Sequence, residues 1–450
     1  MKHRSAASAR KAISALFVAN EEHAVMSQLL ESKRIVIATI GSLGDLHPCL
    51  ALALELMRRG HQVTIATTPY YASKVEALGV TFQPMRPDWN PTDPELIRQC
   101  DDLKKGPEVL YRKMLLPELR GTYTDLLSVA RDADLLIAGE LVYAAPLVAE
   151  KLKLPWVSAI LSPFSFFSSF DPSVMVNAPA LIHLRKAGPS VYRAGLNIGR
   201  LATKHWSNPV RDLRREHGLR LECDPVFRDK FSPYLVLALF SRWLAEPQPD
   251  WPPQTSQPGF VYFEAPTVGT QLPSLLSDFL ASGTEPIVFT QGSTAVHSPG
   301  DFYKVSAIAA KRLGRRAVLL GAIDGLEVDS TDLLTLPYAS YSQLFLHAIV
   351  NVHQGGSGTT GEALRAGRPM LIVPYGWDQP DNAARVERLG AGLHVPRSQY
   401  TVETATAALK ALLDNSRFSV RAAAGGAQVA TEDGLASACD AITAVFWKTA

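Results

Sequence analysis

Short apolar runs recur along most of this 450-residue chain, and helix-like stretches separate them. The first two runs are residues 34–40 and 61–67, and the segment 48–59 between them has the pattern of an apolar helix. Strands that alternate with helices are typical of an α/β fold with parallel sheets. The sequence therefore predicts an α/β fold over nearly its whole length.

A proline-rich segment divides this alternation into two series. Residues 246–258 hold five prolines in thirteen positions, and proline, which lacks a backbone N–H, is excluded from helix interiors and central strands. A second series of apolar runs begins at 286–290. Because 450 residues exceed what one hydrophobic core usually serves, we expect two domains. The expected units are a disordered extension at 1–32, a first domain at 33–245, a linker region at 246–284, a second domain at 285–428 and a final helix at 429–450.

Charge balance and cysteine usage exclude several classes of function. The 45 basic and 43 acidic residues leave no global field that would attract nucleic acid. The four cysteines are scattered without metal-ligand spacing, which indicates free thiols in a reducing compartment. No apolar run is long enough to span a bilayer. We therefore expect a cytoplasmic protein with no nucleic-acid partner and no membrane span.

One stretch in the second series carries the strongest chemical signal. The apolar run 348–352 leads into His353 and a glycine-rich turn, and a helix is expected over 360–366. Glycines let a diphosphate approach the backbone, and the free N–H groups of a helix N-terminus attract anions. Asp378 and Gln379 follow another apolar run and can bind sugar hydroxyls. A phosphate seat beside a hydroxyl-binding pair predicts a nucleotide-sugar site.

This stretch resembles the donor-binding signature of the UDP-glycosyltransferase family, whose members have the GT-B fold. Its motifs are His-x-Gly-Gly-x-Gly, Glu-Ala-Leu-x-x-Gly-x-Pro and Asp-Gln-x-x-Asn, and the glycine run has the length found in the bacterial and sterol-type branch. The resemblance implies two facing Rossmann-like domains with parallel sheets and a cleft between them. The first domain is then the acceptor-binding domain, the second binds the nucleotide sugar, and the last helix returns to the first domain. The resemblance implies no metal and no other cofactor.

The resemblance also assigns donor-binding roles to individual residues. His353 is expected to donate to a phosphate oxygen, Glu362 to hold the ribose hydroxyls and Tyr338 to stack on the base. A generic strand–turn–helix would explain the glycines, but neither His353 nor Asp378 and Gln379. The expected donor-binding residues are Ser42, Gly292, Ser293, Tyr338, Ala339, His353, Gly355, Gly356, Ser357, Gly358, Thr359, Glu362, Asp378 and Gln379.

The first series contains the expected catalytic base. Its first turn, residues 41–48, matches the family segment that presents this base, and Asp45 occupies the position. A carboxylate there can take the proton of an acceptor hydroxyl as that hydroxyl attacks the anomeric carbon, and a general base contributes about 10²–10⁴-fold to the rate. Helix capping is the alternative role of Asp45. His47 is the reserve base and Glu140 is expected to orient the base or raise its pKa, although both residues can also be structural.

Four phenylalanines occur within seven residues directly after the apolar run 156–161. They are Phe164, Phe166, Phe167 and Phe170, and serines separate them. Such a segment suits the wall of an apolar acceptor pocket, and core packing explains it equally well. If the pocket interpretation holds, we expect planar, apolar acceptors such as phenolics, polyketides or sterol-like lipids.

Together these features predict an inverting glycosyltransferase that moves a hexose, with glucose as the first expectation, from a UDP-sugar to a lipophilic or aromatic small molecule. A dTDP-deoxysugar transferase acting on a lipid or polyketide, for example a rhamnosyltransferase, is the alternative. A nucleotide-sugar epimerase would need several acid–base residues around the sugar, and a non-catalytic sugar-nucleotide binder would not need Asp45. A dehydrogenase is disfavoured because Gly41 and Gly44 lack the G-x-G-x-x-G spacing.

Overall fold

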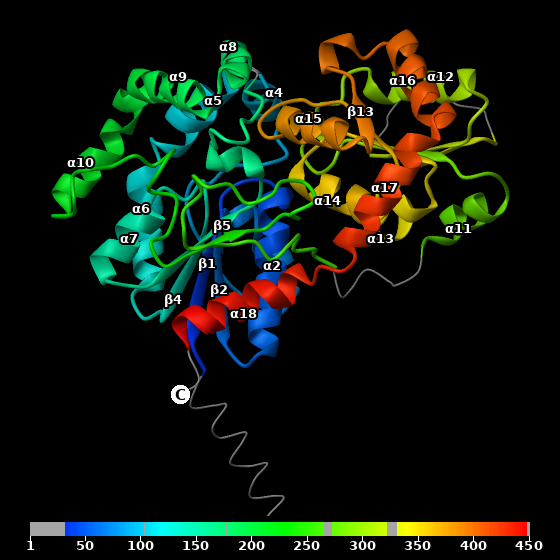
Figure 1. The fold of residues 1–450 in the computed structure, drawn as a ribbon. Coiled ribbons are helices and arrows are strands. Elements are labelled where there is room, and N and C mark those ends of the chain that lie inside the picture. The colour runs from blue at the N-terminus through cyan, green and yellow to red at the C-terminus, as the bar shows by residue number, and fades with distance from the viewer. Residues whose placement is uncertain (1–31, 103, 176–177, 265–271, 322–330, 448–450) are drawn as a thin grey trace, which may run out of the picture.

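The computed structural model describes residues 32–102, 104–175, 178–264, 272–321 and 331–447. The extension expected at 1–32 lies outside these residues apart from its last position. Within the described residues the chain forms two β-sheets, and helices cover both faces of each (Figure 1).

The bounds of the elements are as follows. The first sheet contains β1 (Arg34–Ala38), β2 (Gln62–Thr67), β3 (Thr81–Pro84), β4 (Leu135–Gly139), β5 (Trp156–Ile160), β6 (Leu235–Ala238) and β7 (Thr255–Ser256). Its half of the chain also contains α2 (Leu43–Arg58), α3 (Ala72–Glu76), α4 (Pro94–Cys100), α5 (Gly106–Glu108), α6 (Leu119–Ala130), α7 (Ala145–Leu152), α8 (Pro179–Leu184), α9 (Pro189–Thr203) and α10 (Asn208–Glu216). The second sheet contains β8 (Ile287–Thr290), β9 (Ala317–Leu320), β10 (Leu333–Leu336), β11 (Val350–His353), β12 (Met370–Ile372) and β13 (Gly392–His394). The helices of the second half are α11 (Ser274–Ala281), α12 (Phe302–Arg312), α13 (Tyr341–Leu344), α14 (Ser357–Arg365), α15 (Gln379–Leu389), α16 (Val402–Asp414), α17 (Ser416–Val429) and α18 (Gly434–Phe446).

Both sheets are parallel in every strand pair of the described residues. The strand order is β3-β2-β1-β4-β5-β6-β7 in the first and β10-β9-β8-β11-β12-β13 in the second. The strands are apolar along their length because helices bury both faces, as in β4 (Leu-Leu-Ile-Ala-Gly) and β8 (Ile-Val-Phe-Thr). The predicted parallel α/β architecture is therefore confirmed.

The last helix leaves the second half and packs on the first. Cys439 and Ile442 of α18 lie in the same apolar cluster as Leu52 of α2, and α18 lies beside α2 in Figure 1. At the end of α2, Arg59 Nη1 lies 2.6 Å from Asp440 Oδ1. Helix α18 thus joins the two halves.

The proline-rich segment also belongs to both halves. Its residues Thr255–Ser256 form β7, an edge strand that pairs with β6, and edge strands tolerate neighbouring prolines. Phe260 is buried in a cluster that contains residues of both halves, and Val261 is buried in a cluster of the first sheet and its helices. This segment therefore contributes to the packing of both halves as well as connecting them.

Two helices begin earlier than the sequence pattern indicated. Helix α2 starts at Leu43 rather than at Pro48, because Ser42 and Asp45 form a capping box. Asp45 is therefore the third residue of the helix and not its N-cap. Helix α14 starts at Ser357 rather than at residue 360, because the glycine run needs a left-handed backbone only at Gly355, where φ is +92°.

A buried ion-pair network fastens α15 to the segment that follows β5. Arg385 is 1% exposed, and its guanidinium pairs with Asp171 and, at 2.8 Å, with Asp381 Oδ2. The Val174 backbone N–H donates to Asp381 Oδ1 at 2.8 Å, and Arg388 Nη2 lies 3.2 Å from Asp171 Oδ1. The network therefore crosses between the two halves of the chain.

Replacing the cation of this network should destabilise the protein markedly. We expect Arg385→Met to lower the free energy of unfolding by about 3–5 kcal/mol, because it leaves two carboxylates without their buried partner. Urea denaturation measures this loss. The matched control is Arg120→Met, whose pair with Glu216 is solvent-exposed, and its expected loss is much smaller because exposed ion pairs contribute little to stability. Equal losses in the two variants would show that the network does not hold the halves together.

Candidate functional site

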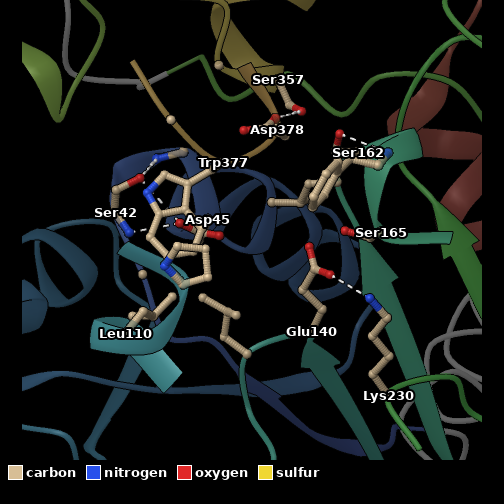
Figure 2. Close-up of a pocket in the computed structure, with 18 of the residues that line it drawn as sticks. Ser42, Asp45, Leu110, Glu140, Ser162, Ser165, Lys230, Ser357, Trp377 and Asp378 are labelled. Atoms are coloured by element: carbon tan, nitrogen blue, oxygen red, sulfur yellow. Dashed lines mark hydrogen bonds and ion pairs between the residues drawn. The ribbon is translucent and has the colours of Figure 1, made fainter. Parts of the chain in front are cut away.

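A cavity of about 2310 Å³ lies between the two halves, along the edges at which the parallel strands end. Its first wall includes the turns after β1 and β4, and its second wall includes the turns after β8, β11 and β12 (Figure 2). Open parallel sheets bind their ligands at this edge. The cavity is therefore the candidate functional site.

Asp45 lies in the first turn of α2, where the start of the helix fixes its carboxyl group. Its Oδ2 accepts hydrogen bonds from the Ser42 backbone N–H at 2.8 Å and from the Ser42 hydroxyl at 3.2 Å. Gly41 has a φ of +143°, and a side chain there would collide with this carboxyl. Both hydrogen bonds that the described residues make to the side chain go to Oδ2. The other carboxyl oxygen is left for a ligand.

The pKa of Asp45 is raised to about 7. The main cause is the loss of bulk water, because protein surrounds the carboxyl although part of it opens into the cavity. The negative charges of Glu140 and Asp378 raise the pKa further, and the hydrogen bonds from Ser42 lower it. A carboxyl that titrates near neutrality has the property required of a general base.

Glu140 follows β4 and faces the cavity together with Asp45 (Figure 2). Its Oε2 lies 3.2 Å from Lys230 Nζ, and no hydrogen bond between described residues joins it to Asp45. The Lys230 ammonium is buried and lies 4.9 Å from the ring centroid of Phe167 and 5.3 Å from that of Phe231. Burial lowers the pKa of Lys230, and the charge of Glu140 opposes this. Glu140 therefore acts on Asp45 through space and is held by the lysine.

His47 also lines the cavity, but its ring is packed. The imidazole stacks on Phe263 with ring centroids 4.8 Å apart, and its Nε2 is buried without a hydrogen-bond partner among the described residues. Burial lowers the pKa of His47 to about 3, and the charge of Lys74 adds to the effect. The ring is neutral and a weak base, so this geometry favours packing over proton transfer.

The N-terminus of α14 forms part of the second wall, and Gly356, Ser357, Gly358 and Thr359 line the cavity there. The first N–H groups of a helix have no partner inside it and attract anions. Asp378 lies beside this turn, and its Oδ2 accepts from the Ser357 hydroxyl and from Asn382 Nδ2, each at 2.8 Å. The structure thus brings the glycine-rich turn and the predicted sugar-binding pair together.

Asp378 and its neighbour Gln379 are both oriented by hydrogen bonds. Burial raises the pKa of Asp378 to about 6, and the hydrogen bonds from Ser357 and Asn382 lower it. Gln379 Oε1 accepts from the backbone N–H groups of Tyr375 at 2.8 Å and of Gly376 at 3.3 Å. Its amide NH₂ is therefore the group that Gln379 presents to a ligand.

His353 lies behind this wall, and the next residue lines the cavity. His353 is fully buried, and its Nδ1 accepts the Gly355 N–H at 3.1 Å. Gln354 lies on the cavity surface, with its Nε2 3.5 Å from Thr359 Oγ1 and its Oε1 without a partner among the described residues. A side chain at Gly292, where φ is +64°, would collide with this amide. Gln354 therefore lines the cavity at this turn, whereas His353 lies behind it with its buried Nε2 free of a partner among the described residues. The phosphate contact of His353 stays a prediction.

The remaining donor-site candidates lie around the same wall. Gly292 and Ser293 line the cavity after β8, and Tyr338 and Ala339 line it before α13. Tyr338 is 63% exposed, so its ring is accessible to a flat partner. Gly355, like His353, lies outside the lining, and its part is to turn the backbone. The structure thus gathers most of the predicted donor-site residues on one surface.

Glu362 faces the cavity from the second turn of α14. Its Oε2 accepts from Arg365 Nη2 at 2.8 Å, and the guanidinium of Arg365 also lies 4.1 Å from the ring centroid of Tyr262. Burial raises the pKa of Glu362 to about 7, although Arg365 opposes the rise. The carboxyl is thus available in the cavity and is fixed by an arginine of its own helix.

The four phenylalanines after β5 separate into three environments. Phe164 and Phe167 line the cavity. Phe166 is buried and stacks on Trp251 with ring centroids 4.1 Å apart. Phe170 is 46% exposed and lies outside the cavity lining. Both the pocket and the core interpretation thus describe part of this segment.

Gln354, Trp377 and Lys230 are among the cavity residues that were not identified from the sequence. The sequence motif pointed to the histidine before Gln354 and not to Gln354 itself. Trp377 belongs to the second half, has a φ of +61° and packs against an apolar cluster of the first half. Lys230 occurs in a segment without a motif, and only its contact with Glu140 reveals its place. Gln354 could have been identified from its position directly before the glycine run. No sequence signal marks Trp377 or Lys230.

Some kinds of site are absent from the described residues. No group of three or more His, Cys, Asp or Glu side chains there is arranged to hold a metal ion. Nor does any helix in this part of the chain have the length and apolar character needed to cross a membrane. The four cysteines are free thiols, and Cys49 and Cys439 are buried.

Two family models match the chain, one on each side of the cavity. Residues 35–166 match the N-terminal domain of glycosyltransferase family 28. Residues 336–441 match the C-terminal domain of proteins like erythromycin biosynthesis protein CIII. The first match contains Asp45 and Glu140, and the second contains the turn before α14 together with Asp378.

Curated relatives match over nearly the whole chain. O-mycaminosyltylonolide 6-deoxyallosyltransferase of Streptomyces fradiae is 31% identical over 428 residues, which are 90% of this chain and 96% of that protein. Sterol 3-beta-glucosyltransferase of Aspergillus fumigatus is 30% identical over 434 residues, which are 92% of this chain. The chain spans only about 30% of the length of that second relative.

Solved structures with the same fold have low sequence identity. CalG4, the calicheamicin glycosyltransferase, superposes with a TM-score of 0.70 at 19% identity, over 93% of this chain and 100% of that one. The spinosyn rhamnosyltransferase SpnG, complexed with thymidine diphosphate, superposes with a TM-score of 0.63 at 18% identity, over 90% of this chain and 99% of that one. These findings confirm the predicted resemblance and the GT-B fold.

The raised pKa of Asp45 has a consequence for stability that can be measured. The unfolded carboxyl titrates near its usual 3.8 and the folded one near 7, so the contribution of Asp45 to stability falls as pH rises between these values and is level above them. We expect Asp45→Asn to increase the free energy of unfolding on the order of 2–4 kcal/mol at about pH 8 and hardly at all at about pH 4.

Urea denaturation at the two pH values tests this expectation. Asp212→Asn is the control, because Asp212 is exposed on α10 and pairs with Arg215. A gain in stability for Asp45→Asn that is the same at both pH values would contradict the assignment of the raised pKa.

Proposed function

Since the chain belongs to the EryCIII-like, family 28 glycosyltransferases of GT-B fold, we propose that it transfers a hexose from a nucleoside-diphosphate sugar to a lipophilic hydroxyl compound, with Asp45 as general base. This proposal rests mainly on the carboxyl group of Asp45, whose pKa lies near neutrality. The carboxyl faces a cavity wall that contains the N–H groups of a helix N-terminus and the proposed sugar-binding pair. UDP-glucose is the first expected donor.

The second wall supplies the donor site in this proposal. The diphosphate binds at the N-terminus of α14, where the Gln354 amide and the Ser293 hydroxyl add hydrogen bonds to the backbone N–H groups. Glu362 holds the ribose hydroxyls, and the exposed ring of Tyr338 stacks on the base. Asp378 and the Gln379 amide bind the hydroxyls of the sugar. This arrangement is supported by the common cavity surface on which all these groups lie.

In the transfer step, Asp45 removes the proton of the acceptor hydroxyl. The hydroxyl oxygen then forms a bond to the anomeric carbon, and the bond from that carbon to the phosphate oxygen breaks with inversion. The charge that develops on the departing diphosphate is stabilised by the N–H groups of α14. Burial raises the pKa of Asp45 so that it can accept a proton near neutral pH, and the charge of Glu140, which Lys230 holds at 3.2 Å, adds to this effect.

The size and lining of the cavity favour a bulky, apolar acceptor. The cavity of about 2310 Å³ exceeds what a nucleotide sugar alone fills, and Phe164, Phe167 and Phe227 line it. The relatives named above act on a macrolide-type compound and on sterols, according to their names. We expect an acceptor of sterol or macrolide size.

A dTDP-deoxysugar is the second candidate donor. It is favoured by the similarity to a 6-deoxyallosyltransferase over almost the full length of both chains. A deoxysugar lacks one hydroxyl that Asp378 or Gln379 would bind, so the two donors should differ in affinity at this pair.

The test is nucleotide release from the full chain, without added metal. UDP-glucose, UDP-N-acetylglucosamine and dTDP-rhamnose are supplied in turn with a sterol, a macrolide aglycone and phenolic acceptors, and the product masses are recorded. We expect release that depends on the acceptor, together with a mass gain of one sugar. An altered sugar without a new glycoside would indicate an epimerase, and binding without release from any combination would refute the transferase.

The variant Asp45→Asn tests the base. We expect it to lower kcat by about 10²–10⁴-fold while the affinity for UDP stays unchanged, because Asp45 does not touch the nucleotide. In the unaltered protein, kcat/KM should rise with pH and level off above about 7 as Asp45 loses its proton. Glu140→Gln should move this midpoint to lower pH. Full activity of Asp45→Asn would show that Asp45 is not the base and would leave Glu140 or His47 as the candidate.

Gln354→Leu tests the phosphate contact. We expect about ten- to a hundredfold weaker UDP binding in a calorimetric titration, because a charge-assisted hydrogen bond to the diphosphate is lost. Gln428→Leu on the exposed side of α17 serves as the control and should bind UDP normally. Unchanged UDP binding by Gln354→Leu would show that other groups of the turn, and not Gln354, bind the diphosphate.

A further inference from the structure

Helix α9 lies at the outer corner of the first half, and almost none of it is buried (Figure 1). Tyr192 is the one buried residue among its fifteen, all of which the structure describes. Ile198 and Leu201 are each 70% exposed, and Val191 is 43% exposed. Surface helices normally turn such side chains toward the core. The apolar face of α9 therefore has no partner among the described residues.

The exposed apolar side chains of α9 form one stripe. At about 3.6 residues per turn, positions 191, 194, 198, 201 and 202 fall on the same side of the helix, and they hold Val, Ala, Ile, Leu and Ala, all exposed. Tyr192 and the cavity-lining Thr203 lie on another side. The stripe consequently points away from the buried Tyr192, and at its C-terminal end Leu201 and Ala202 also line the cavity.

The segment that carries this stripe is strongly basic, although the whole chain is nearly neutral. Residues 179–220 contain nine Arg or Lys and two Asp or Glu, while the full chain has 45 and 43. Five of the nine cations pair with carboxylates: Arg185 with Asp171, Arg193 with Asp250, Arg200 with Asp224, Arg214 with Glu150 and Arg215 with Asp212. Lys186 and Lys204 are exposed at the two ends of α9. An outward apolar stripe is therefore combined with a local excess of positive charge.

We propose that α9 docks this protein on an anionic lipid bilayer, with the helix in the plane of the headgroups and Val191, Ile198 and Leu201 in the acyl boundary. An apolar stripe flanked by basic residues is the pattern of interfacial helices. The charge also decides between occupants, because a second copy of this chain would bring an equally basic surface against the first. An anionic surface matches both the stripe and the charge.

Docking through α9 would also bring the cavity to the lipid surface. Leu196, Gly199 and Thr203 of the same helix line the cavity, and so do Leu201 and Ala202 of the stripe. The stripe therefore continues to the cavity, and a bilayer that covers the stripe would lie beside it. A lipophilic acceptor dissolved in the bilayer then has a short path into the site. This last step rests on the proposed transferase function, whereas the docking itself does not.

The experiment is flotation of the full chain with lipid vesicles. We expect binding to vesicles of phosphatidylcholine mixed with phosphatidylglycerol, weaker binding to phosphatidylcholine alone, and a severalfold loss at high salt, because salt screens the charge attraction. Absence of binding to the anionic vesicles would overturn the proposal. Because flotation requires no turnover, this outcome is distinct from a failure of the transferase assay.

Substitutions distinguish vesicle binding through α9 from nonspecific adhesion of the protein to lipid. Val191→Ser with Ile198→Ser should weaken vesicle binding about tenfold or more, because two buried aliphatic side chains are lost from the interface. The matched control is Leu275→Ser with Val420→Ser, which are 59% and 66% exposed elsewhere on the surface. Equal losses in both double variants would overturn the assignment to α9. Circular dichroism establishes that each variant is folded.

Two further measurements exclude the competing occupants. Lys186→Gln with Lys204→Gln should reduce binding to the anionic vesicles and leave the weak binding to phosphatidylcholine unchanged. Sedimentation over a range of protein concentrations tests for a second copy. A dimer that dissociates in Val191→Ser with Ile198→Ser would replace the bilayer by a partner chain and refute the proposal.

Discussion

Parallel strand pairing is the constraint on which the candidate site depends. Because all strands of a sheet run in one direction, the turns after β1 and β4 meet at one edge, and those after β8, β11 and β12 meet at one edge of the other sheet. Helix α18 and the Arg385 network then join the halves that carry these edges. The cavity is thus a consequence of topology, and residues that are hundreds of positions apart become neighbours in it.

Local patterns predicted the architecture because they depend on short-range physics. Apolar runs identified the strands, and the glycine run identified the turn before α14. Element ends were harder to predict. Pro48 suggested the start of α2, whereas the capping box of Ser42 and Asp45 begins the helix at Leu43. A proline marks a preferred boundary, but a satisfied cap outside it extends the helix.

The side-chain directions of the site could not be predicted from the sequence. Whether His353 or Gln354 turns into the cavity depends on how the chain leaves β11, and the motif does not report this angle. The phenylalanines illustrate the same limit, because a left-handed backbone at Phe167, with φ of +49°, divides rings that the sequence treats as one group. Lys230 reaches Glu140 from 90 residues further along the chain, a distance over which local patterns carry no information.

Helix capping and proton transfer are compatible roles for Asp45, although the sequence presents them as alternatives. One carboxyl oxygen satisfies the start of α2, and the other is left for a ligand. The cap also holds the carboxyl in a place where water is scarce and two further acidic groups face it. The same contacts that begin the helix therefore create the unusual titration of the group, and this ionisation opposes folding at neutral pH.

The ion-pair network between the halves attaches α15 to the segment that follows β5. Asp381 accepts the N–H of Val174, a few residues after the phenylalanine segment, and it lies on the same helix as Gln379, one turn from Asp378. The segment that follows the phenylalanines and the turn of Asp378 and Gln379 are consequently both attached to α15. A ligand that shifts α15 must also shift the segment that holds the aromatic wall, and such coupling is reciprocal in equilibrium binding. If the aromatic wall holds the acceptor and Asp378 with Gln379 holds the sugar, as proposed, the network would link the binding of the two ligands, and each would change the affinity of the other by the same factor.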